Sequence, residues 1–146
     1  MTADTDMIKL YSSRILALAA DIPRHCRLDA PGATVKLRAP LCGSAVTVDL
    51  TCEDGIITDY GQDVKACALG QAAASVVGAN IVGCTPAQVR AAQGTLRAML
   101  KENGPAPTAP FDGLEVLMPA RDYKNRHASI MLALDAAIEA IETACA

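Results

Sequence analysis

The spacing of apolar residues changes along the chain, and the changes predict the order of helices and strands. Residues 5–20, TDMIKLYSSRILALAA, place apolar side chains three or four positions apart, as one face of a helix requires. Thr5 or Asp6 can cap the start of this helix. Residues 21–32 contain two prolines and a glycine, which predicts a loop.

A period of two follows the loop. Apolar and polar residues alternate over 33–38 and again over 44–52, which is typical of strands with one buried face. The dipeptide Asp54-Gly55 is a strong hairpin signal, and residues 56–66 then return as a third strand. Three consecutive strands joined by short turns predict an antiparallel meander.

The second half of the chain has a helical pattern. Residues 67–83 are small and apolar nearly all round, which predicts a buried helix. Thr85 and Pro86 are a cap and a first-turn proline, and they open a helix that Gly104 ends. After a proline-rich loop and a short turn, the last helix is expected from about Tyr123 to Thr143.

These elements predict an α+β fold in a single domain over residues 1–146. The three-stranded antiparallel meander would carry the helices on one face, with a helix at each end of the chain. Half of the residues are hydrophobic, but there is no Trp and one Phe, so the core must be built from aliphatic side chains.

Charge and hydropathy exclude several classes of partner. The net charge of −3 argues against binding to nucleic acid, which requires a basic face. No apolar run reaches the ~18 residues that a membrane span needs. The start, MTADTDMIKL, is acidic and polar rather than a secretory signal, so a cytoplasmic location is expected.

Six cysteines offer thiol chemistry, and a chain without a signal is not expected to join them as disulfides. For any one of them an inert place in the core is the commoner interpretation. Two stand out by position: Cys42 precedes the second strand, and Cys67 opens a helix, where the dipole favours a thiolate. A meander brings these two positions to the same end of the sheet.

The other thiols have weaker cases. Cys52 lies at the far end of the second strand, Cys84 is expected to pack, and Cys145 is a terminal residue expected to fray. Cys26 lies in the loop beside His25 and Arg27, both of which favour a thiolate, although a surface thiol is the commoner interpretation.

His127 is the candidate third ligand. It stands at the start of the last helix, where a cationic side chain opposes the dipole, so its imidazole is expected to be neutral. Neutral imidazole is the form that binds metals. A surface or capping histidine is the equally weighted alternative.

Several segments in order resemble the U-type iron–sulfur cluster assembly scaffolds, which include the NifU N-terminal, IscU and SufU-like proteins. The segments are IPRHCRL at 22–28, APLCGS at 39–44, VKACALGQAAASVV at 64–77 with IVG at 81–83, and LMPARDYKNRHASIMLAL at 117–134. The resemblance covers nearly the whole chain. It implies that Cys42 and Cys67 bind iron, a [2Fe–2S] cluster or zinc, and that the partners are a cysteine desulfurase and apo iron–sulfur acceptor proteins.

The chain departs from the family pattern at two ligand positions. The family aspartate falls on Ser44, and the third family cysteine falls on Ser129. His127, two residues before Ser129, is the residue expected to replace the missing thiol.

Three functions remain open from the sequence. The first is a non-enzymatic scaffold or carrier that holds iron or a [2Fe–2S] cluster through Cys42, Cys67 and His127. The second is a zinc-bound sulfur acceptor for a cysteine desulfurase. The third, which Ser44 and Ser129 favour, is a relative that keeps the fold and binds a protein partner without metal.

Overall fold

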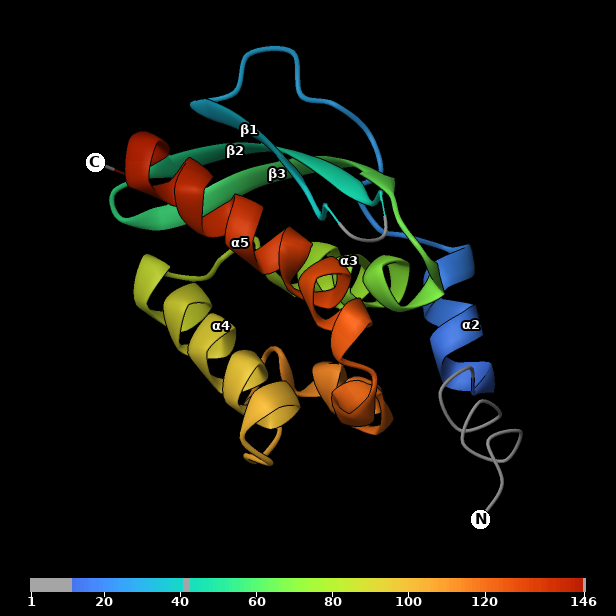
Figure 1. Cartoon of the computed structure of the whole chain (residues 1–146). Coiled ribbons are helices and arrows are strands. Elements are labelled where there is room, and N and C mark those ends of the chain that lie inside the picture. The colour runs from blue at the N-terminus through green and yellow to red at the C-terminus, as the bar shows by residue number, and fades with distance from the viewer. Residues whose placement is uncertain (1–11, 41–42, 146) are drawn as a thin grey trace.

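A computed structural model describes residues 12–40 and 43–145, and it confirms the α+β fold (Figure 1). Its elements, in chain order, are α2 (Ser13–Ala20), β1 (Ala33–Arg38), β2 (Ala45–Glu53), β3 (Ile56–Lys65), α3 (Ala68–Asn80), α4 (Pro86–Lys101), the 3₁₀ helices η1 (Asp112–Asp122) and η2 (Lys124–Arg126), and α5 (His127–Ala144). None of the described helices is long and apolar enough to cross a membrane.

The described part of the predicted first helix is α2, which ends at Ala20 as the sequence pattern predicts. Ser12 caps α2, and its side chain accepts a hydrogen bond from the backbone N–H of Ile15 at 3.3 Å. The predicted caps, Thr5 and Asp6, lie outside the described residues.

The three strands form the predicted antiparallel meander in the order β1-β2-β3. Val35 of β1 pairs with Val48 of β2, and Val46 of β2 pairs with Val64 of β3. The hairpin turn has positive φ at both Asp54 (54°) and Gly55 (77°), as a two-residue turn of the I′ kind requires.

The helices cover one face of this sheet, as predicted (Figure 1). α5 runs along β1 and β2 and also packs against α3 and α4. α3 is rich in Ala and Gly and is buried over most of its length, which lets it lie close to α5. α4 begins with the expected cap, since the Thr85 side chain and Gln88 form a reciprocal capping box.

The loop between α2 and β1 covers the edge of the sheet that β3 forms. The carbonyl of Arg24 accepts a hydrogen bond from the backbone N–H of Gln62 at 3.0 Å, and Nε2 of His25 accepts one from the N–H of Val64 at 3.2 Å. Gly61 lets the loop approach, because a Cβ there would collide with the carbonyl of Cys26. The loop therefore occupies the edge positions where another strand could otherwise add.

A buried carboxylate fixes the same loop to the outer face of the sheet. The side chain of Asp49 is fully buried and accepts hydrogen bonds from Arg27 Nε at 2.6 Å, from the N–H of Leu28 at 3.0 Å and from Thr34 Oγ1 at 2.5 Å. Burial alone raises the pKa of Asp49, but the hydrogen bonds from Arg27, Thr34 and Leu28 together hold the pKa below its ordinary value.

Asp49→Asn is expected to lower the free energy of unfolding at pH 7 by about 2 to 3 kcal/mol, because an amide loses the charge-assisted bonds to the loop. A depressed pKa stabilises the fold above the ordinary carboxyl pKa, and this stabilisation is lost as the pH falls through the lowered value. The difference in the free energy of unfolding between wild-type protein and Asp49→Asn, measured with urea, should therefore become smaller below about pH 4. Asp59→Asn, at an exposed ion pair with Arg24, is the control and should change stability by less than about 0.5 kcal/mol. A difference that stays the same in acid would contradict the claim that the charge of Asp49 stabilises the fold.

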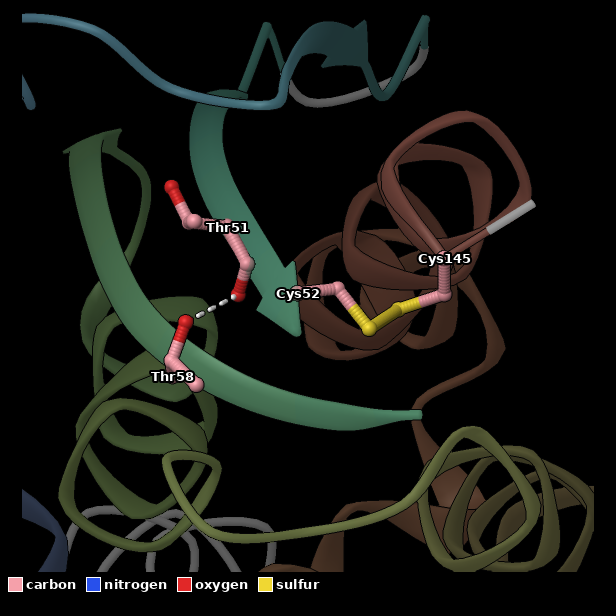
Figure 2. The surroundings of a disulfide bond; sticks show 4 residues. All are labelled: Thr51, Cys52, Thr58 and Cys145. Carbon is pink, nitrogen blue, oxygen red and sulfur yellow. Dashed lines mark hydrogen bonds between the residues drawn. A yellow bond between two sulfur atoms is a disulfide. The ribbon is translucent and has the colours of Figure 1, made fainter. Parts of the chain in front are cut away.

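A disulfide joins Cys52 to Cys145, with an S–S distance of 2.12 Å and a Cα–Cα distance of 5.3 Å (Figure 2). The expectation that no cysteines are paired, and that Cys145 frays at the terminus, is therefore wrong. It was based on redox compartment and chain position, whereas α5 returns its last turn to the hairpin end of β2. The bond crosslinks the C-terminal end of α5 to the sheet.

Candidate functional site

Cys67 stands where the sequence predicts, at the N-cap of α3 and two residues after β3 ends. Its backbone is extended (φ −68°, ψ 169°), and its side chain makes no capping hydrogen bond. The side chain is partly exposed. The first N–H groups of a helix and the positive end of its dipole favour a negatively charged ligand at this position.

Two buried serines lie beside this thiol. Ser129 Oγ, from the first turn of α5, is 3.5 Å from the sulfur of Cys67 and 2.9 Å from Ser44 Oγ. Ser129 and Ser44 are only 1% and 3% exposed. Gly70 makes the space for them, because a Cβ at this position would lie 2.5 Å from Ser129 Oγ. Three segments far apart in the sequence thus meet at one point.

Cys42 lies outside the described residues, so its place in the site remains a prediction. The backbone on either side of it is described: the N–H of Ala39 donates to the carbonyl of Ser44 at 2.8 Å, and the N–H of Gly43 donates to the carbonyl of Ala39 at 3.1 Å. These bonds join described residues on either side of residues 41–42 to one another, and Ser44 faces Ser129.

His127 is the first residue of α5 and is 4% exposed. Its Nε2 lies 3.0 Å from the carbonyl oxygen of Ala120 in η1. A carbonyl only accepts, so Nε2 carries a proton, and Nδ1 is the ring nitrogen left to bind a metal. The described contacts bring Ser129, rather than His127, to the sulfur of Cys67. The ligand role of His127 therefore remains a prediction, and only Nδ1 can perform it.

The remaining free thiols of the described chain are not at this site. Cys84 is buried and its sulfur donates to the carbonyl of Asn80 at 3.2 Å, and burial raises the pKa of this thiol. The prediction that Cys84 packs is confirmed. Cys26 is exposed in the loop at the edge of β3. Within residues 12–40 and 43–145, no three His, Cys, Asp or Glu side chains are grouped closely enough to hold a metal ion.

Two cations flank the site on the outer face of the sheet. Arg38 and Lys65 both pair in register with Ala45, one from each neighbouring strand, and both are exposed. The salt bridges of the described residues do not include either cation. The end of the sheet next to Cys67 thus carries two exposed cations.

Comparison with solved structures identifies the fold. A crystal structure of a nitrogen-fixing NifU-like protein (N-terminal) from Brucella abortus is 44% identical, with a TM-score of 0.93 over 95% of this chain and 96% of that one. This chain belongs to the U-type scaffold family. It is a NifU-like protein, as the ordered sequence motifs predict.

Two more distant structures share the NifU-like fold. One is a candidate iron–sulfur cluster assembly scaffold protein for the SUF system from Fervidobacterium islandicum AW-1, with 18% identity and a TM-score of 0.81 over 92% of this chain and 98% of that one. The other, described only as a hypothetical protein, has 20% identity and a TM-score of 0.82 over the same shares. No family model matches the chain, and no curated protein matches it.

Proposed function

We propose that this NifU-like protein is an iron–sulfur cluster assembly scaffold or carrier, which holds iron or a [2Fe–2S] cluster through Cys42, Cys67 and His127. The position of Cys67 supports this proposal most directly. Cys67 is partly exposed at a helix N-terminus, Ser129 contacts its sulfur, and Ser44 contacts Ser129. The two serines stand at the positions where the family has further ligands. The side chains hold the cargo and release it, and no reaction is catalysed.

The donor set fits a cargo that must be released. Thiolates are the ligands that iron–sulfur clusters prefer, and imidazole replaces thiolate in some of these sites. A scaffold with two thiolates and one neutral histidine has two fewer negative charges than a family member that also has the third cysteine and the aspartate. We therefore expect weaker binding than in a scaffold with the full set of ligands.

The partners would be a cysteine desulfurase, which supplies sulfur, and apo iron–sulfur proteins, which accept the cluster. Arg38 and Lys65, exposed at the same end of the sheet as Cys67, favour a partner whose docking surface is acidic. The association should weaken at high salt, because exposed charges are screened.

Cys67→Ala is expected to abolish retention of iron after anaerobic loading with Fe²⁺ and sulfide. Wild-type protein should keep iron and acid-labile sulfide in equal amounts after desalting. Cys42→Ala should behave like Cys67→Ala, whereas Cys26→Ala, which removes an exposed thiol in the loop at the β3 edge, should load normally. Normal loading of Cys67→Ala would refute the proposed site.

His127→Gln separates the two roles open to this histidine. A glutamine N–H can still donate to the carbonyl of Ala120, but it does not replace Nδ1 as a ligand. If His127 is a ligand, the variant should keep the melting temperature of wild-type protein within a few degrees and bind Fe²⁺ at least about tenfold more weakly. Unchanged affinity in a folded variant would restrict His127 to holding η1 against α5.

A further inference from the structure

The hydrogen-bonded chain from Cys67 through Ser129 to Ser44 has no role in the ligand set proposed above. The sulfur and the two hydroxyl oxygens follow one another at 3.5 Å and 2.9 Å, and both hydroxyls are buried. A buried hydroxyl that lies between two such atoms donates to one of them and accepts from the other. The direction of the chain therefore depends on where the protons lie.

The state of the sulfur sets this direction. When Cys67 keeps its proton, the S–H group donates to Ser129, and Ser129 donates to Ser44. When the sulfur is bound to a metal it has no proton, so Ser129 donates to the sulfur and Ser44 donates to Ser129. Only the two hydroxyl protons turn, so no proton leaves the serines and no alkoxide forms.

We propose that Ser129 is a positioning residue whose hydroxyl is the hydrogen-bond partner of the Cys67 sulfur, accepting from the thiol and donating to the metal-bound sulfur, with Ser44 holding it in place. The metal-bound half of this proposal rests on the proposed function. Ser129 is not a metal ligand in this account, because a serine oxygen binds well only after deprotonation, and burial disfavours the charged alkoxide.

A donor to a metal-bound sulfur withdraws electron density from it. Hydrogen bonds to cluster sulfurs are one of the means by which proteins adjust the potential of a cluster. Ser129 would therefore make Cys67 a weaker electron donor to its cargo than a free thiolate. Gly70 makes this position of the hydroxyl possible, since a Cβ there would lie 2.5 Å from Ser129 Oγ.

The test uses the full chain loaded with Co²⁺, whose sulfur-to-metal charge-transfer band reports the electron density on the ligating sulfur. Ser129→Ala should bind the same amount of Co²⁺ as wild-type protein, with its charge-transfer band shifted to longer wavelength. Ser129→Thr restores a hydroxyl and should restore the band. Ser44→Ala should shift the band in the same direction by less. An unshifted band, or loss of Co²⁺ from Ser129→Ala, would overturn the proposal.

The metal-free protein gives a second, independent measurement. The infrared S–H stretch of Cys67, assigned by its loss in Cys67→Ala, should move to higher frequency in Ser129→Ala and return in Ser129→Thr. If wild-type protein binds no Co²⁺, the proposed function fails, and the S–H band alone shows whether the Cys67 thiol donates to Ser129. An S–H band that does not respond to Ser129→Ala would overturn the proposal in either case.

Discussion

Reduction of the Cys52–Cys145 disulfide is expected to lower the free energy of unfolding by about 2 to 4 kcal/mol, or roughly 5 to 15 °C in melting temperature. The bond closes a loop with a sequence separation of 93, so it removes many conformations from the unfolded chain. It also ties the last turn of α5 to the sheet, where Gly32 leaves Ala144 room beside Leu50. Thermal unfolding with and without dithiothreitol measures the effect.

Single-cysteine variants separate the disulfide from other effects of the reductant. Cys52→Ser should melt like the reduced wild-type protein, and its melting temperature should not respond to dithiothreitol. Cys26→Ser, which removes an exposed free thiol, should behave like wild type in both conditions. Equal stability of oxidised and reduced wild-type protein would contradict the proposed contribution of the crosslink.

Ser129→Cys is expected to tighten binding of Fe²⁺ or Zn²⁺ at least about tenfold. The wild-type oxygen already lies 3.5 Å from the sulfur of Cys67, so a sulfur placed there would be within reach of the same ion. Thiolates are far better ligands than a neutral hydroxyl for both metals. Competition with a coloured chelator measures the affinity.

Ser75→Cys is the matched control, because it also places a thiol at a buried serine, here on α3 with its side chain directed to the carbonyl of Asp21. It should leave the affinity unchanged. If Ser129→Cys binds no more tightly than wild-type protein, the cargo is not held beside Cys67.

Local signals were sufficient to predict most of the fold. The Asp54-Gly55 turn, the Thr85 cap and the apolar residues of α3 each act within a few positions, and the structure confirms all three. The last helix was predicted to begin at about Tyr123, but 3₁₀ turns occupy the chain until α5 begins at His127. The backbone of Tyr123 is not helical (φ −113°, ψ 74°), so this residue separates η1 from η2 instead of opening the last helix.

Side-chain contacts between segments far apart in the chain could not be predicted from the sequence. The Ser44–Ser129 hydrogen bond and the Cys52–Cys145 disulfide join residues 85 and 93 positions apart. Periodicity does not show which side chains of two elements meet. The resemblance identified Ser44 and Ser129 only as positions where the family's ligands are missing. In the structure the two serines contact each other, and Ser129 also contacts Cys67.

Cluster assembly with a cysteine desulfurase, cysteine, Fe²⁺ and dithiothreitol, which reduces the delivered sulfur to sulfide, tests the central claim most directly when it is carried out under anaerobic conditions. Iron and acid-labile sulfide bound to the reisolated protein would be counted for wild-type protein and for Cys67→Ala. We predict iron and sulfide in equal amounts on wild-type protein, and neither on Cys67→Ala. Bound zinc without sulfide, together with faster desulfurase turnover, would contradict the scaffold account and favour a sulfur acceptor. Absence of iron, zinc and sulfide from wild-type protein would show that this NifU-like fold carries no metal cargo.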